Sequence, residues 1–419
     1  MASIVPDRPA TGLEAAGRLT GEPVRGHLLI INLRGFQRAD ALYRELAALG
    51  WKTTVLDIAE PALLRWYALA RSFHPSLARW RRRFERTRNR LSRTAFAFKY
   101  KSRLCGRLIA KSGAKYDLIM LGGGMFAPGW PPPAQRYVLV CDCTVKLGEG
   151  ELLSGVDFAS SASAERWYAL ERMLYRSAGC VFSASDWVTR SLVGDYGMDP
   201  ARAVTVGEGS SLEASEGLPK HYDGKTILYV GYEFKRKGGE VLLAAFERVA
   251  AEIRGAEVLI AGPPRLADPL PRGVRLFGPL SRQELSQLYA RASVFVMPSL
   301  FEPFGQVFLE AMEHKLPCIG SDKCAIPEII LDGETGFLTP AGDARALAER
   351  IIYLLRRPDT MRLMGERGRA RLRQRFTWPA VARRIDERLV ELLRPMSRSQ
   401  ARAHPSAAPS SGAGAAWPL

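Results

Sequence analysis

The chain has 419 residues, of which 47% are hydrophobic and 25% are charged, and its net charge is +17. This balance is ordinary for a soluble globular protein, and the length is sufficient for two domains. No run of about eighteen apolar residues occurs, which argues against a helix that spans a membrane. Residues 1–25 have no apolar core of a secretory signal, and we expect them to form a disordered lead. The Ala-, Ser- and Pro-rich residues 396–419 are expected to form a disordered tail.

Six cysteines are scattered along the chain, and no two of them form a Cys-x-x-Cys pair. Cys141 and Cys143 lack the further partners that a zinc site needs, so we predict neither a metal nor another cofactor. Cys141 and Cys180 lie in apolar, strand-like runs, where a free cysteine behaves as a small hydrophobic residue. A reducing compartment is the simpler interpretation, and we expect a cytoplasmic protein.

Strand and helix patterns alternate in the first half of the chain. Apolar runs predict strands at residues 27–32 and 52–56, with a helix at residues 39–49 between them. This alternation predicts a parallel sheet with helices on both faces. Further along we expect strands at residues 116–121, 137–141, 179–184 and 203–206, and helices at residues 165–177 and 186–196.

Residues 65–115 carry nearly all of the excess positive charge. They contain sixteen Lys or Arg residues and one acidic residue, Glu85, with aromatic residues interleaved. This composition is typical of basic amphipathic helices at an anionic membrane surface, which is the interpretation that we favour. Two alternatives are open. One is a solvated helical insertion whose aromatic residues pack inward, and the other is a nucleic-acid-binding region, a partner that we do not expect.

A second α/β unit follows a Gly-, Ser- and Pro-rich linker at residues 208–223. Its pattern again alternates between short apolar strands and amphipathic helices, which predicts a second parallel sheet. The expected strands are residues 226–230, 257–261, 274–277 and 294–297, and the expected helices are residues 239–249, 281–290, 344–355, 361–373 and 378–393.

The segment from Phe295 to Pro340 is the most informative part of the chain. A buried strand at residues 294–297 leads into a loop, and a helical pattern covers residues 306–313. The free N–H groups and the positive dipole at such a helix start form a ready anion site. Glu302 and Glu310 flank this helix start. Carboxylates in such a place need hydroxyl groups or other donors, and sugar or ribose hydroxyls meet that need.

This segment resembles the retaining glycosyltransferases of family 4, which have the GT-B fold. The resemblance rests on motifs that occur in the order that is typical of the family. It implies two Rossmann-like domains that face each other across a cleft, and a C-terminal helix that crosses back to the first domain. The matching residues are Pro298-Ser299, Glu302 to Gly305, Glu310-Ala311, Pro317, Ala325 to Glu328, Asp332-Gly333 and Thr335-Gly336.

The resemblance also divides the chain into domains. It implies an acceptor domain at residues 26–207, which contains the basic helical insertion at residues 65–115. Residues 224–377 would form the donor-binding domain, and residues 378–395 the crossing helix. Ligands of open α/β sheets lie at the carboxyl ends of the strands, so we expect the site in the cleft.

Donor-binding roles follow from the resemblance. Glu310 would bond the ribose hydroxyls of a UDP- or GDP-sugar, and Glu302 would contact the transferred sugar or its phosphate link. Backbone N–H groups at the helix start would face the sugar and the diphosphate. These groups belong to Phe304, Gly305, Gln306 and Val307.

Gly231 and the pair Lys237-Gly238 match the residues that open the donor domain in this family. Lys237 would hold the diphosphate and stabilise it as it leaves, and Arg236 would share that task. Gly262 would make room near the nucleotide. The resemblance therefore implies that Lys237, Arg236 and Glu302 are the catalytic residues.

Several positions depart from the family pattern. Tyr232 follows the strand-end glycine, where an arginine is frequent. Lys315 replaces a helix-ending glycine and must either adopt a left-handed conformation or end the helix differently. The loop after the first strand has a single glycine, Gly35, where many members have two. His27 and His74 are better interpreted as structural or exposed than as a sugar-contacting histidine, so we assign no catalytic histidine.

Candidates for the acceptor side lie at two strand ends of the first domain. Gly123 and Gly124 follow one strand and would let the backbone approach a ligand closely. Asp142 and Thr144 follow the next strand. An ordinary turn at the two glycines, and a cap or turn role for Asp142, are equally open.

The expected function is transfer of a sugar from a nucleotide sugar to an acceptor hydroxyl, with retention of configuration and without a metal. The basic region suggests a glycan or lipid-linked acceptor, and hence a peripheral protein at the inner face of a membrane. Two alternatives are open: a sugar-phosphate synthase with a soluble acceptor, and a binding protein of the same fold that has lost catalysis.

Overall fold

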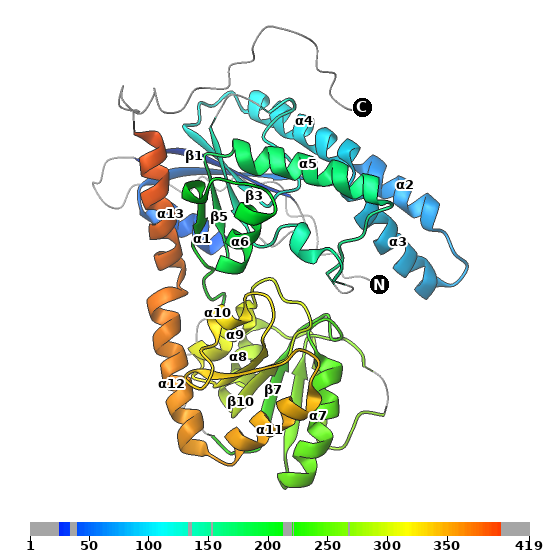
Figure 1. Ribbon diagram of the computed structural model, residues 1–419, viewed down its shortest axis with the longest axis vertical. Helices are drawn as coiled ribbons and strands as arrows, with labels where there is room; N and C mark the ends of the chain where they lie inside the picture. The colour runs from blue at the N-terminus through cyan, green and yellow to red at the C-terminus, as the bar shows by residue number, and fades with distance from the viewer. Residues whose placement is uncertain are drawn as a thin grey trace.

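The computed structural model describes residues 25–33, 40–132, 136–151, 154–212, 220, 222–266 and 269–394. These residues form two α/β domains, each built around a six-stranded parallel sheet (Figure 1). The predicted tail, the predicted lead apart from Arg25, and half of the predicted linker lie outside the described residues.

The first sheet has the strand order β2-β1-β3-β4-β5-β6. Every neighbouring pair in it is parallel, as the alternation of strands and helices predicts. The chain reverses its direction of travel across the sheet between β1 and β3, which creates a crevice at the carboxyl ends of these strands. The strands are β1 (Gly26–Leu33), β2 (Trp51–Ile58), β3 (Leu118–Gly122), β4 (Tyr137–Cys141), β5 (Cys180–Ser183) and β6 (Ala203–Thr205).

The second sheet has the order β12-β11-β10-β7-β8-β9, so its reversal point lies between β7 and β10. Two of its strands, β11 and β12, were not among the predicted elements. The strands are β7 (Thr226–Val230), β8 (Glu257–Ala261), β9 (Val274–Gly278), β10 (Val294–Met297), β11 (Cys318–Ser321) and β12 (Gly336–Thr339).

Helices flank both sheets, and several begin with side-chain caps that satisfy free N–H groups. Ser160 and Ser185 accept such bonds in the first domain, and Ser281 forms a reciprocal capping box with Glu284 in the second. The flanking helices are α1 (Asp40–Ala48), α5 (Ser161–Ser177) and α6 (Asp186–Gly194) in the first domain, and α7 (Gly239–Glu252), α8 (Arg282–Arg291), α9 (Gln306–Glu313), α10 (Ile326–Ile329) and α11 (Ala344–Leu355) in the second; short 3-10 turns occupy Lys146–Gly148 and Pro200–Arg202.

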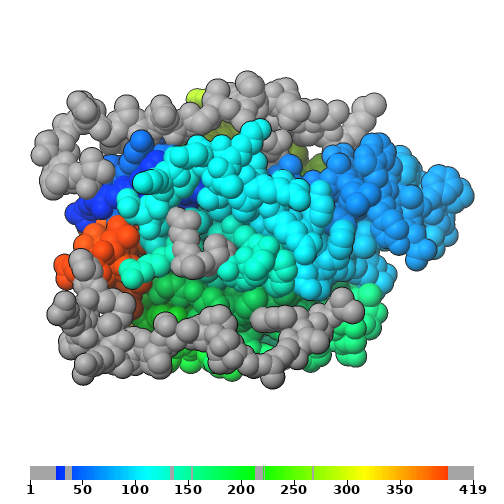
Figure 2. All heavy atoms as spheres, turned by 90° about the horizontal axis from the view of Figure 1, so that it is seen from above, coloured from blue at the N-terminus to red at the C-terminus, as the bar shows by residue number. Residues whose placement is uncertain are grey.

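The basic region folds into three helices, α2 (Ala62–Ser72), α3 (Leu77–Ser92) and α4 (Ala95–Ser112). Helix α4 packs on the first domain, where Phe98 is buried against Trp167. Within α3, all of which is described, no side chain is buried. The α2–α3 hairpin projects from the side of the domain, and in Figure 2 it forms the blue extension beyond the other described residues.

Helices α12 (Pro358–Arg375) and α13 (Trp378–Leu393) run along both domains as one column (Figure 1). Ile385 and Leu389 of α13 are buried in the core of the first domain, and the indole Nε1 of Trp51 donates a 2.8 Å hydrogen bond to Asp386 Oδ1. The expectation of a C-terminal helix that crosses back is therefore confirmed.

Candidate functional site

The loop after β7 is folded closely on itself. A Cβ atom at Gly231 would lie 2.4 Å from Lys237 Cδ, so only a glycine lets the lysine chain lie across the strand end. Gly238, with φ of 73°, approaches the Pro298 carbonyl so closely that a Cβ atom would lie 1.9 Å from its oxygen. The Leu300 N–H donates to the Arg236 carbonyl at 2.9 Å. The loops after β7 and β10 therefore meet at the reversal point of the second sheet.

Glu302 lies between two cations at this point. Its Oε2 is 3.4 Å from Lys237 Nζ and 3.5 Å from Arg236 Nη1, and its side chain is only 10% exposed. Arg236 is further held by Glu233 and by the Phe301 carbonyl, to which Nη1 donates at 2.7 Å. The three predicted catalytic residues thus converge. The arginine is the most constrained of them, because its guanidinium already donates hydrogen bonds to Glu233 and to the Phe301 carbonyl.

Helix α9 starts beside this cluster, as predicted. Gly305 is its N-cap residue and has a φ of 103°, a conformation that favours glycine. Phe304 is buried against Phe376, which anchors the loop. The Gln306 side chain donates from Nε2 to Glu208 Oε2 at 2.6 Å. Val307, one residue on, is half-buried and packs against the core.

Glu310 lies one turn further along α9, where Tyr289 Oη donates to its Oε2 at 3.0 Å. The Tyr289 ring stacks on His314, and His314 Nε2 lies 2.9 Å from Ser286 Oγ. Burial raises the pKa of the Glu310 carboxyl. This packing fixes the position of the carboxyl group and leaves its second oxygen for another donor.

Gly262 follows β8 with a φ of 113°, and a Cβ atom there would lie 2.8 Å from the Gly231 carbonyl carbon. The two strand-end glycines therefore pack backbone against backbone. The predicted donor-binding residues lie at neighbouring strand ends of the second domain, but the structure does not test their roles, which stay predictions.

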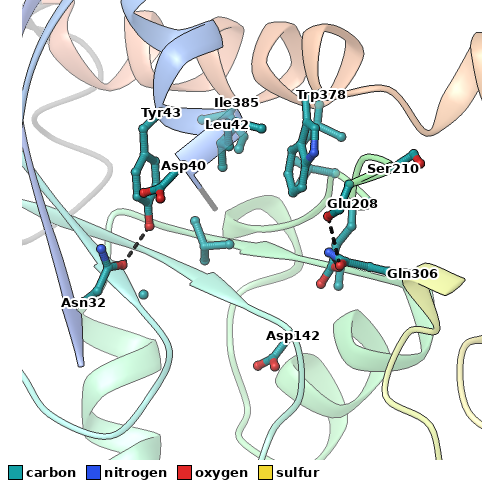
Figure 3. A pocket seen from close by; sticks show the side chains of 18 of the residues that line it. Asn32, Asp40, Leu42, Tyr43, Asp142, Glu208, Ser210, Gln306, Trp378 and Ile385 are labelled. Atoms are coloured by element: carbon teal, nitrogen blue, oxygen red, sulfur yellow. Dashed lines mark hydrogen bonds between the residues drawn. The ribbon is translucent and has the colours of Figure 1, made fainter. Parts of the chain in front are cut away.

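The first domain contributes to a cavity of about 560 Å³ between the domains (Figure 3). Gly123 and Asp142 line it, as the acceptor-side prediction expects. Asp142 is itself exposed, and partial desolvation of its carboxyl raises the pKa. Thr144 and Gly124 are not among the described residues that line it. Thr144 is buried, with Oγ1 2.7 Å from Ser191 Oγ, and a Cβ atom at Gly124 would lie 2.5 Å from the Tyr175 hydroxyl oxygen.

The two first-domain histidines have structural or exposed positions, as expected. His27 Nε2 lies 2.9 Å from Thr54 Oγ1 at the start of β1, and His74 is on the α2–α3 turn, where Nδ1 accepts the Ser76 N–H. Cys141 and Cys180 are buried in β4 and β5 as free thiols. Among the described residues, no three His, Cys, Asp or Glu side chains are placed to hold a metal ion together.

Most residues of the cavity were not predicted from the sequence, among them Asn32 at the end of β1, Glu208 after β6 and Trp378 at the start of α13. Burial and the charge of Asp142 raise the pKa of the Glu208 carboxyl to about 7. Each of these three residues lies next to a strand end or a helix start, but no motif marks it. Their convergence becomes visible only when both domains and α13 are in place.

Two Rossmann-like domains with a cleft between them and a crossing C-terminal helix define the GT-B class of proteins. Residues 224–357 match the family model described as "Glycosyl transferases group 1". The resemblance that was inferred from the sequence is thereby confirmed, and this region belongs to that glycosyltransferase family.

Among curated proteins, the chain is similar to a phosphatidyl-myo-inositol mannosyltransferase of Mycobacterium leprae, with 32% identity over 210 residues. The match covers 48% of this chain and 55% of that protein, so the chain spans about half the length of the curated relatives that it matches.

Solved structures agree with the fold. Sucrose-phosphate synthase from Thermosynechococcus elongatus superposes with a TM-score of 0.64 and 20% identity, covering 87% of this chain and 98% of that one. HepE of Anabaena, solved in complex with UDP-glucose, gives a TM-score of 0.59 at 14% identity, covering 87% of this chain and all of the other. These likenesses confirm the GT-B fold.

Proposed function

We propose that the chain is a retaining glycosyltransferase, which transfers a sugar from a nucleotide-diphosphate sugar to an acceptor hydroxyl. The observation that carries the proposal is the position of Lys237 and Glu302. Their charged atoms lie 3.4 Å apart beside the N-terminal ends of α7 and α9, at the reversal point of the second sheet. In open α/β sheets this is the place where ligands bind.

The donor side suits a diphosphate that carries a sugar. Two helix N-termini present N–H groups and positive dipole ends, and Lys237 adds a full charge. Glu302, before the start of α9, and Glu310, within it, would accept hydrogen bonds from hydroxyls of the transferred sugar and of the ribose. The UDP-glucose bound to the structural neighbour HepE supports a UDP-sugar as the first donor to examine.

The main catalytic requirement of the chemical step is stabilisation of the leaving group. The acceptor oxygen forms a bond to the anomeric carbon on the face from which the diphosphate departs, and the bond from that carbon to the phosphate oxygen breaks. The acceptor proton passes to the leaving phosphate. Lys237 stabilises the negative charge that develops there, while Arg236 holds the Glu302 loop through the Phe301 carbonyl. No covalent enzyme intermediate is required.

The α2–α3 hairpin supports an acceptor at an anionic membrane surface. Trp66, Phe73 and Leu77 are 68%, 67% and 74% exposed, although large apolar side chains are normally covered. The adjoining helix α3 carries seven arginines, and each basic residue near an anionic surface contributes about 1 kcal/mol. No described helix is long and apolar enough to cross a membrane, so we propose peripheral binding.

A thermal-shift panel tests the donor assignment. UDP, GDP, ADP and their sugar conjugates are each added to the purified full chain. We expect one nucleotide family to raise the melting temperature, and its sugar conjugate to act at least as strongly. Stabilisation by none of them would contradict the proposal and favour a protein that has kept the fold without catalysis.

A further inference from the structure

Helix α6 begins where the two domains meet, and the second domain completes its first turn (Figure 1). Ser185 is the N-cap residue and accepts the Val188 N–H at 3.3 Å. The N–H groups of Asp186 and Trp187 have no acceptor within the helix, as at any helix start. Glu328 of α10 accepts both of them with its two carboxylate oxygens, at 2.8 and 2.7 Å. A carboxylate in this position also interacts favourably with the positive end of the helix dipole.

The backbone of Glu328 is held from within the second domain. Arg371 of α12 donates to the carbonyl groups of Glu328 and Ile329, at 2.6 and 3.0 Å. The Glu328 N–H donates to the Ala325 carbonyl at 3.0 Å. The carboxylate therefore reaches the first domain from a fixed position, and its two hydrogen bonds to α6 depend on the distance between the domains.

Trp187 packs from the same helix start against the loop that follows β10. Its ring is T-shaped to the ring of Phe301, with 6.1 Å between the centroids and 68° between the planes. Aromatic pairs with this geometry attract each other beyond the effect of the area that they bury. Phe301 belongs to a loop, yet its side chain is buried. A side chain of the first domain thus contacts the loop of the second domain that carries Glu302.

Phe301 directly precedes Glu302, and Arg236 holds its backbone. Arg236 Nη1 donates to the Phe301 carbonyl at 2.7 Å, and the Leu300 N–H donates to the Arg236 carbonyl at 2.9 Å. The residue before Glu302 is therefore fixed by an arginine of its own domain and by a ring of the other domain. A shift of Phe301 would move Glu302, whose Oε2 lies 3.4 Å from Lys237 Nζ.

We propose that Trp187 is a positioning residue for Glu302, and that Glu328 keeps Trp187 in place by binding the start of α6. The Glu302 loop of the second domain is then fully ordered only while the start of α6 is docked against it. The inference rests on the proposed glycosyl transfer for the role of Glu302, but the positioning can be tested without that reaction. A contact that only held the domains together would leave the order of the Glu302 loop unchanged.

Hydrogen–deuterium exchange of the full chain tests the positioning without a substrate. The Leu300 amide is bonded to the Arg236 carbonyl, so peptides that span residues 299–306 report the order of the loop. We expect Trp187→Ala to speed exchange in these peptides about tenfold, as loss of one aromatic contact implies. Trp187→Phe keeps a ring and should exchange as the parent does. Arg190→Ala, at an exposed position of the same helix, is the control. Unchanged exchange in a folded Trp187→Ala protein would overturn the inference.

Glu328 provides a second test from the opposite domain. Glu328→Ala removes the acceptor of two N–H groups and leaves Trp187 itself intact. Exchange should become faster in peptides that span residues 185–189, at the start of α6, and also in those that span residues 299–306. Glu247→Ala, at an exposed position of α7, is the control. Faster exchange at the start of α6 alone would show that Glu328 only caps the helix, and it would overturn the inference.

Kinetic constants separate positioning from donor binding. In a folded Trp187→Ala protein, the rate of UDP release from UDP-glucose should fall about tenfold or more, while the Kd of UDP changes less than about twofold. Trp187→Phe should recover most of the rate. A Trp187→Phe protein as slow as Trp187→Ala, or a loss of UDP affinity equal to the loss of rate, would overturn the inference. If exchange responds as expected but the parent protein releases no UDP, the positioning contact stands and the proposed transferase activity fails.

Discussion

The Nζ of Lys237 lies 3.4 Å from Oε2 of Glu302, across the two loops that follow β7 and β10. The cation predicted to hold the leaving diphosphate is thus paired with the carboxylate predicted to face the sugar. A bound diphosphate would take over the lysine, which frees Glu302 to accept sugar hydroxyls. Donor binding and the arrangement of the catalytic groups would then be a single event.

Replacing Lys237 by alanine should lower turnover more than donor affinity. The lysine stabilises charge that develops as the diphosphate leaves, and loss of one such group typically costs about 10²–10³ in kcat. The measurement is kcat together with the donor Kd. Lys235→Ala, an exposed lysine of the same loop, is the control and should behave as the parent protein does. Normal turnover by a folded Lys237→Ala protein would remove the assignment.

Glu310→Ala should weaken sugar-nucleotide binding strongly. The carboxylate is held by Tyr289 with one oxygen left for the ribose, and hydrogen bonds to a charged group contribute about 1.5–3 kcal/mol. This corresponds to a loss of about tenfold to a hundredfold in donor affinity, which calorimetric titration measures. A folded variant that binds the donor nucleotide as tightly as the parent would show that Glu310 does not contact it.

The α2–α3 hairpin should direct the protein to anionic vesicles. Flotation with vesicles that contain acidic lipid should recover the chain at low salt, and recovery should fall at high salt because screening weakens the arginine contacts. Trp66→Ser combined with Leu77→Ser should reduce recovery severalfold without loss of stability, since both side chains are exposed. Leu363→Ser on α12 is the control for an exposed apolar residue. Absence of co-flotation at low salt would contradict membrane binding.

The stability of the first domain should depend on pH through Glu171. This buried residue of α5 accepts from Tyr196 Oη at 2.6 Å, and burial raises the pKa of its carboxyl from 4.5 to about 7. The folded state then binds the proton more tightly than the unfolded state. The stabilisation is complete below about pH 4.5 and is lost as the pH rises through 7.

Glu171→Gln should therefore change the free energy of unfolding by different amounts at pH 5 and at pH 8. The amide still accepts a hydrogen bond from the tyrosine and never ionises, so its stability does not fall as the pH rises. The stability of the variant relative to the parent should therefore increase by up to about 3 kcal/mol from pH 5 to pH 8. Denaturant unfolding at both values provides the comparison, with Glu165→Gln as the exposed control on the same helix. A difference that does not vary with pH would show that Glu171 keeps an ordinary pKa.

Glu328 links the two domains at the start of α6. Its carboxylate accepts the N–H groups of Asp186 and Trp187 at 2.8 and 2.7 Å, and the Trp187 ring contacts Phe301 nearby. Glu328→Ala should destabilise this contact by about 1 kcal/mol or more and enlarge the average radius of gyration of the unliganded protein. Small-angle scattering would detect the change, and an unaltered profile would mean that other contacts hold the domains.

The regular elements could be predicted from the sequence wherever hydrophobic patterns were long or well bounded. The strands at residues 226–230, 257–261 and 294–297, and the helix at residues 306–313, have the predicted limits. The strands β11 and β12 were missed because each has only four residues and contains glycine, which leaves no clear alternation. The order of strands within each sheet could not be predicted either, since no local pattern encodes which strands become neighbours.

Lys315 shows how packing overrides a local preference. It has a φ of 56°, which is the left-handed conformation, the first of the two alternatives expected from the sequence. Glycine favours this conformation, and a lysine adopts it only with strain. Its carbonyl accepts a 2.7 Å hydrogen bond from Tyr222 Oη, and α12 packs so closely that a Cβ atom at Gly365 would lie 1.9 Å from that oxygen. These contacts join distant segments, so they offset the strain in a way that the sequence around Lys315 does not reveal.

The candidate site was predictable where a local motif marks a residue in its own loop, as it does for Lys237 after β7 and for Glu302 after β10. It was not predictable where the groups come from separate elements. Asn32, Glu208 and Trp378 are far apart in the chain and meet only because α13 crosses back and the residues that follow β6 line the same cavity. Thr144 shows the opposite error, because position at a strand end does not reveal that its hydroxyl faces α6.

Proton NMR of the reaction distinguishes retaining transfer from a nucleotide sugar from the alternatives, because it reports the configuration of the new linkage. The full chain is incubated with the nucleotide sugar that stabilises it, an α-linked donor, and with a sugar acceptor. The account predicts release of the nucleoside diphosphate and a product whose new linkage is α. A β-linked product would contradict retention, and no release of diphosphate beyond the rate without protein would contradict glycosyl transfer itself.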